Sequence, residues 1–415
     1  MIIEQQVEKV SNQVVSEIRS LALDKFASRA EFHEESLSFP KDNFIDLHRA
    51  GLNAPTIDRE YGGLGLGHHN GDVRTLWQMT TAIAMGDMST ARCWEGHNNA
   101  LLLINNIASE DQKRRWFDGV VNDGNIWSVW SGEPQTKIPD QKKTVGTTVV
   151  ATDDGYLLNG TKVFCSSATG ASHAILLVSL EGPGGARHAA SSTDAVMMLA
   201  CDLSAPGISF NDAWWNPMGM RASVSYQVIF ENVFIPKNHK IGYSGQFLTE
   251  EWQTRFTPQY AATFLGGAHA AYEYTKRYVQ SQKKTNDPYI QHRLAKMAIN
   301  LKTSELWLDH VAELWKNDNI EEAKSAGIMT WYLVEQLATE TVNHALHACG
   351  ARAMASRTQL ERIYRDLSFY VRHDNDDHLL ATVGKSVLGV THDRSFFNAS
   401  SQRNGKSKNG HSSEQ

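Results

Sequence analysis

The sequence has few cysteines and no long apolar run. Its 415 residues include four scattered cysteines, Cys93, Cys165, Cys201 and Cys349, with no CxxC pair. This pattern fits neither a disulfide framework nor a zinc site, and it is compatible with a reducing cytoplasm. No stretch approaches the roughly 18 apolar residues of a membrane-spanning helix, and the start MIIEQQVEKV does not resemble a signal peptide. We therefore expect a cytoplasmic protein with no membrane partner.

The sequence also lacks a basic run. The formal net charge is −6, with 40 Lys and Arg residues against 46 Asp and Glu residues. A protein that binds nucleic acid carries a concentrated positive surface, so no nucleic-acid partner is expected. The chain is longer than the roughly 250–300 residues at which one hydrophobic core stops growing, which predicts two or three domains.

Hydrophobic periodicity divides the chain into a helical, a strand-rich and a second helical block. Residues 1–127 show the three- and four-residue spacing of amphipathic helices, interrupted by YGGLGLG at 61–67, which we interpret as a turn. Residues 128–240 contain short strands without helical crossovers, which predicts a small β-barrel. Residues 241–400 predict a four-helix bundle. The polar, Gly- and Ser-rich residues 401–415 predict a disordered tail.

Within these blocks the expected elements can be placed more closely. Residues 144–164 read as two strands that meet at a tight turn in the sequence DDG. The bundle is expected to use helices at 257–282, 289–316, 321–348 and 375–399.

Five segments resemble those of the acyl-CoA dehydrogenase superfamily, in the same order along the chain. They are NAPTIDREYGGLGLG at 53–67, SVWSGEP at 128–134, GTKVFCSS at 160–167, GMRASVSYQVIFENVFIP at 219–236 and QLERIYRDLSFYVRHD at 359–374. The resemblance covers roughly residues 5–395. It implies a mainly α fold with a central β domain, a bound flavin and a homotetramer assembled through the last helical domain.

The resemblance places the flavin at 128–134 and 160–167. A flat isoalloxazine ring needs an apolar wall and a few hydrogen-bond donors at its polar edges. The first segment offers Trp130, Ser131 and Gly132. The second offers Phe164, Ser166 and Ser167. The alternative, that the aromatic residues fill the barrel core and the serines form turns, stays open.

The chain departs from the dehydrogenases at the catalytic base. Removing the proton next to a thioester requires a carboxylate within hydrogen-bond reach. The resemblance puts Asp374, directly after His373, where the family has glutamate, and aspartate is one methylene shorter. Some members place the base on a helix of the last domain, but that region offers Arg255 and Phe256. The sequence therefore weakens the prediction of dehydrogenation.

A second departure concerns the cofactor. The family holds the adenosine half of FAD with an Arg-x-x-Phe segment and a GGxGY turn. Gln282 and Thr285 stand at the first place, and ACGARAM at 348–354 replaces the second. These changes favour FMN, which has no adenosine half, and FAD stays open as an alternative.

The departures resemble those of one branch, the two-component flavin-dependent monooxygenases, which includes dibenzothiophene monooxygenases and aminosugar N-oxygenases. The shared features are His373 and Asp374 followed ten residues later by Gly384, the FCS sequence ending in Ser166, and His97 in EGHNNALL. The branch implies reduced FMN from a separate flavin reductase and dioxygen. These form a flavin peroxide that oxygenates a small organic substrate at sulfur, nitrogen or aromatic carbon.

The resemblance also suggests roles for these residues. A histidine can donate a proton near pH 7 and take one back, which predicts catalysis by His373. His97 and Ser166 are expected as further donors, and Asp374 as a partner that orients His373. No metal site is expected, because clustered acids at a helix start more often serve the helix itself. Two alternatives remain: an acyl-CoA dehydrogenase with FAD and Asp374 as base, and a catalytically silent flavin-fold binding protein.

Overall fold

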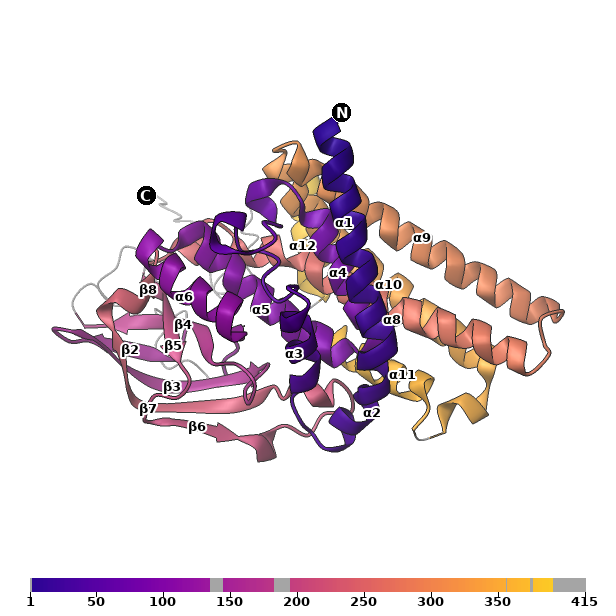
Figure 1. Cartoon of the computed structure of the whole chain (residues 1–415), viewed down its shortest axis with the longest axis horizontal. Helices are drawn as coiled ribbons and strands as arrows, with labels where there is room; N and C mark the ends of the chain where they lie inside the picture. The colour runs from indigo at the N-terminus through magenta and orange to yellow at the C-terminus, as the bar shows by residue number, and fades with distance from the viewer. Residues whose placement is uncertain (1, 135–144, 183–194, 356, 374–375, 391–415) are drawn as a thin grey trace, which may run out of the picture.

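The computed structural model consists of a sheet domain beside a larger body of helices (Figure 1). The described residues are 2–134, 145–182, 195–355, 357–373 and 376–390, and the side chains of 2–10 and 376 are not among them. The expected tail at 401–415 and the candidate residue Asp374 lie outside the described residues.

Six helices and a π-helical turn precede the sheet. They are α1 (Ile2–Leu21), the π-helical turn Ala22–Phe26, α2 (Ala27–Glu35), α3 (Lys41–Arg49), α4 (Val73–Gly86), α5 (Met88–Ile107) and α6 (Glu110–Asp123). Helix α5 begins where the Asp87 carboxylate accepts hydrogen bonds from the backbone N–H groups of Ser89 and Thr90. It is the most deeply buried of these helices, because it lies between the other helices and the sheet.

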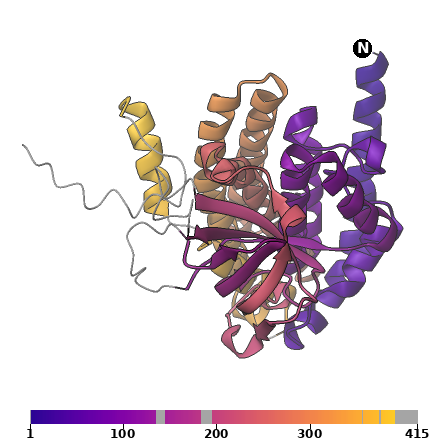
Figure 2. The same cartoon turned by 90° about the vertical axis from the view of Figure 1, so that its left-hand side faces the viewer.

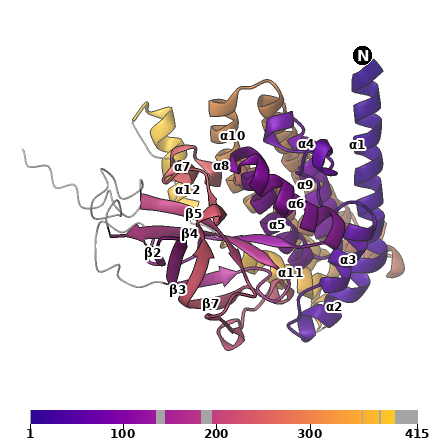
Figure 3. The ribbon, with the colours of Figure 1, turned by 60° about the vertical axis from the view of Figure 1, so that its left-hand side comes forward.

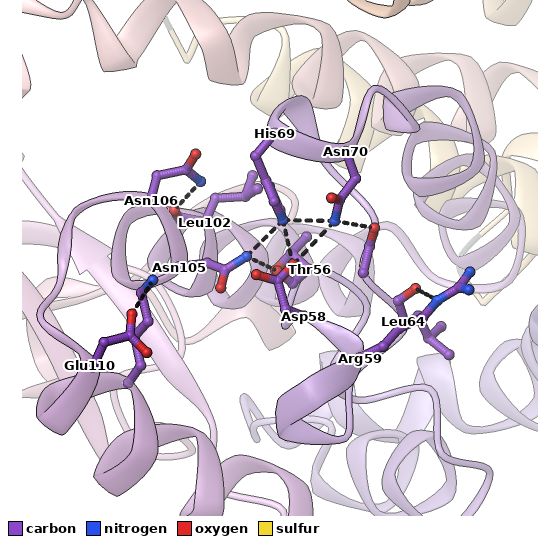
Figure 4. A network of polar contacts seen from close by, with 12 residues as sticks. Thr56, Asp58, Arg59, Leu64, His69, Asn70, Leu102, Asn105, Asn106 and Glu110 are labelled. Atoms are coloured by element: carbon purple, nitrogen blue, oxygen red, sulfur yellow. Dashed lines mark hydrogen bonds and ion pairs between the residues drawn. The ribbon is translucent and has the colours of Figure 1, made fainter.

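The glycine-rich segment between α3 and α4 is a loop, as the sequence predicts. Gly62, Gly65 and Gly67 have φ values of 89°, 69° and 132°, a region that side chains rarely adopt. Asn70 fixes this shape, since its Nδ2 donates to the Gly65 carbonyl oxygen (2.7 Å) and to Asp58 Oδ1 (3.1 Å) (Figure 4). The polar side chains of this loop are thus used to hold the loop itself.

Within the described residues the sheet has eight strands. They are β1 (Trp127–Trp130), β2 (Thr148–Ala151), β3 (Gly155–Cys165), β4 (His173–Glu181), β5 (Val196–Asp202), β6 (Ile208–Asn211), β7 (Tyr226–Pro236) and β8 (Lys240–Ile241). The order is β6-β7-β3-β2-β4-β5-β8, and β1 pairs in parallel with β4. Strands β2 and β3 are antiparallel around the expected DDG turn. The buried side chains of Trp130, Leu176, Leu199 and Phe230 form part of a separate sheet core.

The helices after the sheet are α7 (Gln246–Thr249), α8 (Trp252–Ser281), α9 (Pro288–Lys316), α10 (Ile320–Cys349), α11 (Gln359–Tyr370) and α12 (Asp376–Val387). Helices α8, α9 and α10 pack together, and α8 also packs on α4. The fourth expected helix, 375–399, corresponds to α12, which ends earlier at Val387. The short amphipathic helix α11 had not been expected as a separate element.

The two groups of helices share one hydrophobic core, and the sheet lies against one side of them. In Figure 2 the strands lie in front of the N-terminal helices in indigo and the C-terminal helices in orange. Helix α5 packs against β1. Helix α11 packs against α5 and α8, which are labelled with it in Figure 3. The expected architecture, mainly α with a central sheet domain, is confirmed. Among the described residues, no helix combines the length and the apolar character needed to cross a membrane.

Candidate functional site

A cavity of about 690 Å³ lies at the contact between the sheet and the helices. This volume is within the range of sites for small ligands and cofactors. Its lining comes from the segments that follow β1 and end β3, from residues 215–225 ahead of β7, and from helices α5, α8 and α11. These segments are far apart in the sequence, so the tertiary fold creates the cavity.

The sheet side of the cavity contains four of the residues expected to bind flavin. Ser131 and Gly132 follow β1, and Phe164 and Ser166 lie at the end of β3. The Gly132 carbonyl accepts a hydrogen bond from the backbone N–H of Val163 (3.1 Å). A Cβ atom at Gly132 would lie 2.4 Å from the Val163 carbonyl oxygen. Only glycine lets these two segments approach so closely and present their edges to the cavity.

Ser166 belongs to a chain of three serine hydroxyls on the cavity wall. Its Oγ lies 2.8 Å from Ser225 Oγ, which lies 2.8 Å from Ser223 Oγ. All three serines line the cavity. A hydroxyl both donates and accepts, so this chain can orient one hydrogen bond toward a bound molecule.

Trp130 and Ser167 support the wall from behind. The indole of Trp130 is buried in the sheet core, where its Nε1–H donates to the Ser166 carbonyl oxygen (3.0 Å). Ser167 is fully buried, and its backbone N–H donates to the Ser223 carbonyl oxygen (2.9 Å). Neither is among the described residues that line the cavity. Their contacts fix the backbone of Ser166 rather than touching a ligand directly.

Phe164 forms an aromatic wall. Its side chain is 55% exposed, and its ring meets Trp214 edge-on with the centroids 4.9 Å apart. The backbone at Phe164 has φ of 54°, and Met220 and Val224 nearby have φ of 57° and 41°. Positive φ at non-glycine residues is strained and concentrates at functional sites. Phe164 and Met220 both line the cavity, so this strained backbone forms part of its wall.

The loop 215–225 is tied to the helical wall by a buried acid. The backbone N–H of Met220 donates to Asp366 Oδ1 on α11 (2.5 Å). Burial raises the pKa of Asp366 to about 7, although the bond from Met220 acts in the opposite direction. This contact holds the loop and α11 together across the cavity.

His373 lies just beyond the end of α11 on the helical wall. Its ring centroid is 4.9 Å from that of Tyr260 and 5.7 Å from that of Tyr370. The residue is exposed and lines the cavity, although the aromatic rings surround it closely enough to desolvate the ring. Desolvation by the surrounding protein, together with the charge of Arg92, lowers the pKa of His373 below its ordinary 6.5. The ring is therefore neutral at pH 7, with one donating and one accepting nitrogen.

The structure adds a charged pair that the sequence interpretation missed. Arg92 of α5 lines the cavity, and its Nη1 lies 3.3 Å from Oε1 of the fully buried Glu95. Glu95 also accepts hydrogen bonds from Thr263 Oγ1 (2.5 Å) and the Tyr370 hydroxyl. Burial raises the pKa of Glu95 to about 7, despite the opposing effects of Arg92 and these hydrogen bonds. The sequence carried one signal that could have identified this pair: Arg92 and Glu95 are the two charged residues of the otherwise uncharged segment that forms α5.

His97 does not reach the cavity. It is fully buried, its Nε2 lies 2.8 Å from the Asn53 carbonyl oxygen, and its Nδ1 accepts from the Trp127 backbone N–H (3.0 Å). Both ring nitrogens are therefore used by the backbone, and burial lowers the pKa of His97 to about 4. The structure gives His97 a supporting position behind β1. The residue of α5 that lines the cavity is Arg92, which lies about one and a half turns before His97.

Carboxylates are scarce on the cavity wall. Among the described lining residues only Glu133 is acidic, and it forms an ion pair with the fully buried ammonium of Lys162. Arg255, at the family's alternative position for the base, stacks on Trp252 and Trp315 instead. Of the described lining residues, none offers an unpaired carboxylate to abstract a proton.

Three family models match the chain in sequence. The N-terminal domain of acyl-CoA dehydrogenase matches residues 9–123, its middle domain residues 130–233 and its C-terminal domain residues 255–371. The chain belongs to the acyl-CoA dehydrogenase family.

Both kinds of activity occur among the similar members of this family. A dibenzothiophene monooxygenase of Rhodococcus erythropolis is 26% identical over 92% of this chain and 94% of its own length. A mitochondrial isovaleryl-CoA dehydrogenase of Oryza sativa subsp. japonica is 23% identical over 88% of this chain and 87% of its own length. The FMN-bound dibenzothiophene monooxygenase TdsC of Paenibacillus sp. A11-2 superposes with a TM-score of 0.82. It is 23% identical and matches 93% of this chain and all of its own.

The fold of this acyl-CoA dehydrogenase family member brings the two segments expected to bind flavin to one cavity. SVWSGEP contributes Ser131 and Gly132, and GTKVFCSS contributes Phe164 and Ser166. The exposed aromatic face, the hydroxyl chain and the close approach at Gly132 provide an apolar wall with donors at its edge. These features fit a flat ring system such as that of a flavin.

Proposed function

We propose that this chain is a two-component flavin-dependent monooxygenase that oxygenates a small organic substrate. Bound reduced FMN, supplied by a separate flavin reductase, provides the two electrons. One atom of dioxygen enters the substrate at sulfur, nitrogen or an aromatic carbon, and the other leaves as water. The similarity to dibenzothiophene monooxygenases and to the FMN-bound relative supports this choice.

One observation carries the proposal: the cavity has hydrogen-bonding groups on both walls and no described lining carboxylate that is unpaired. Ser166 on the sheet side and His373 on the helical side border the same space. Oxygen chemistry on a flavin needs donors that hold oxygen atoms in a water-poor site. The dehydrogenase alternative needs a carboxylate base. The residue expected in that role, Asp374, lies outside the described residues, so its role stays a prediction.

We assign His373 the role of donating a proton to the reacting oxygen atoms and taking one back later. We assign Ser166 a hydrogen bond to the same atoms. Because its pKa is lowered, His373 acts as a neutral ring that donates through one N–H and accepts a proton at the other nitrogen. Ser166 is well placed for donation because Ser225 and Ser223 can pass hydrogen bonds along the hydroxyl chain.

We also propose a homotetramer in the cytoplasm. Ile299 and Leu306 of α9 are seven residues apart, share one helix face and are 62% and 56% exposed. Such apolar surface suits contact with another copy. The four cysteines are free and buried, which is compatible with a reducing compartment. Sedimentation of the purified protein tests the assembly, and a monomer at micromolar concentration would contradict it.

The oxygenase is tested by mixing the protein, loaded anaerobically with reduced FMN, with oxygenated buffer. A transient absorbing species distinct from reduced and oxidised FMN is expected, followed by incorporation of ¹⁸O from ¹⁸O₂ into an added substrate such as indole, dibenzothiophene or indole-2-carboxylate. His373→Asn and Ser166→Ala should shorten the life of the transient species, whereas His347→Asn, on the exposed face of α10, should not.

Immediate reoxidation in the parent protein, combined with bleaching of bound oxidised flavin by acyl-CoAs, would refute the oxygenase and indicate the dehydrogenase. Flavin binding with neither reaction would indicate the silent binding protein.

A further inference from the structure

Arg92 is an exception on a buried helix. From Met88 to Asn105 every residue of α5 is buried except Arg92, whose side chain is 13% exposed and lines the cavity. A guanidinium does not lose its proton inside a protein, so it brings a permanent positive charge to this wall. Holding such a group at an apolar cavity is unfavourable unless it has partners.

The protein provides only part of that partnership. Arg92 donates through Nη1 to Glu95, and its guanidinium carbon lies 5.7 Å and 5.9 Å from the ring centroids of Tyr260 and Tyr370. None of its nitrogens is among the described buried atoms that lack a partner. Because Arg92 lines the cavity, the guanidinium donors that Glu95 does not use are available to a molecule bound there.

The cations on this wall face the cavity, and their acidic partners lie behind them. Arg372 also lines the cavity, with a side chain that is 64% exposed, and its Nη1 lies 3.5 Å from Oε1 of the buried Glu335 on α10. Glu95 and Glu335 are both excluded from the described lining. A molecule in the cavity therefore meets guanidinium groups before it meets their carboxylates.

We propose that the substrate is a small organic anion, with a carboxylate or sulfinate group bound by Arg92. This inference rests on the proposed monooxygenase function and narrows its substrate class. Arginine suits the task because its planar N–H groups match two oxyanion oxygens. The apolar part of the substrate lies against Trp215 and Phe369, whose rings line the cavity 5.8 Å apart at their centroids.

The phosphate of FMN is a second source of the same chemistry. The two sources separate experimentally, because riboflavin lacks the phosphate. If Arg92 held the phosphate, Arg92→Gln would weaken FMN binding and leave riboflavin binding unchanged. If Arg92 holds the substrate, the affinities for FMN and riboflavin should both be little changed.

The Arg92–Glu95 pair should make anion binding depend on pH. Glu95 contacts Arg92 on its own helix, Thr263 on α8 and Tyr370 on α11. Arg92 in turn lies over the ring of Tyr260, which is close to His373. Burial raises the pKa of Tyr370 and lowers that of His373, so both are uncharged near pH 7 and Glu95 is the carboxylate that compensates Arg92. Once Glu95 is protonated the charge of Arg92 is uncompensated, and anions should bind more tightly at low pH.

The experiment uses the FMN-loaded protein and follows the flavin spectrum as acids are added, without turnover. The probes are benzoate, indole-2-carboxylate and benzenesulfinate, each compared with its neutral amide or parent ring. At least one acid should bind more tightly than its neutral counterpart. Arg92→Gln should weaken that acid by about 10- to 100-fold, and Arg92→Lys should restore part of the loss.

Arg74→Gln is the matched control, because Arg74 pairs with Asp309 and Glu313 at the surface of the helices. It should leave the affinity for acids unchanged. Glu95→Gln should bind the acid at least as tightly as the parent and remove the pH dependence. The proposal is overturned if no acid binds better than its neutral counterpart, or if Arg92→Gln leaves the affinity for the acid unchanged. Because binding is measured without oxygen, this result is independent of whether the oxygenase is active.

Discussion

Replacing Gly132 by alanine should weaken flavin binding, and the structure sets the size of the effect. The added Cβ would lie 2.4 Å from the Val163 carbonyl oxygen, whereas ordinary contacts of this kind begin at 3.4 Å. The segments after β1 and at the end of β3 must therefore separate by about 1 Å. Both contacting groups are backbone, so no flexible side chain can absorb the change. The bond from the Val163 N–H to the Gly132 oxygen, now 3.1 Å, would be lost or bent.

The energetic consequence follows from these two changes. Overpacking of this kind costs about 1–3 kcal/mol, and a lost backbone hydrogen bond costs roughly 1 kcal/mol. A ring that contacts Ser131 and Gly132 must force the displaced segment back into place. If about 1.4–2.8 kcal/mol of the strain is restored on binding, the affinity for FMN falls about 10- to 100-fold.

Titration of FMN against the apoprotein, followed by quenching of flavin fluorescence, measures this directly. Gly384→Ala is the matched control, because Gly384 lies in α12 with nothing within 4 Å of its added Cβ. It should leave FMN binding unchanged. A folded Gly132→Ala protein that binds FMN as tightly as the parent would show that this edge of the cavity does not hold the ring.

Three further predictions concern residues behind the cavity wall. Trp130→Phe removes the N–H that donates to the Ser166 carbonyl oxygen, so the free energy of unfolding should fall by about 1–3 kcal/mol, seen as a lower melting temperature. Flavin binding should weaken as well, and an unchanged affinity for FMN would contradict the supporting role of Trp130. His97→Asn should destabilise the fold but leave the pH dependence of flavin reoxidation unchanged between pH 6 and 8, since His97 is already neutral there; a shifted profile would restore it as a catalytic candidate. Lys162→Met strands the partly exposed Glu133 carboxylate and should lower stability by up to about 3 kcal/mol in thermal unfolding, and Glu133→Gln in the same chain should recover most of that loss.

The sequence was sufficient to predict the fold because local patterns determine element type. The three-residue and four-residue apolar spacing marked α1, α8, α9 and α10, and the strand-rich block between two helical blocks marked the sheet domain. The segments with Ser131, Gly132, Phe164 and Ser166 also followed from sequence, since their motifs carry the family resemblance. The short helix α11 was missed because it was read as part of a motif.

The sequence could not decide which face of a buried helix meets the cavity. His97 and Arg92 are five residues apart on α5, and five residues correspond to about 500° of rotation, which separates their directions by about 140°. Only the packing of α5 between β1, α8 and α11 shows that Arg92 points to the cavity and His97 to the backbone of Asn53 and Trp127. The residues that meet at the cavity come from both groups of helices and from the sheet domain, and their pKa values depend on the burial that this meeting creates. The sequence by itself thus determined the architecture and predicted which segments meet a flavin, whereas the tertiary structure decided the charge and the hydrogen bonding of the cavity.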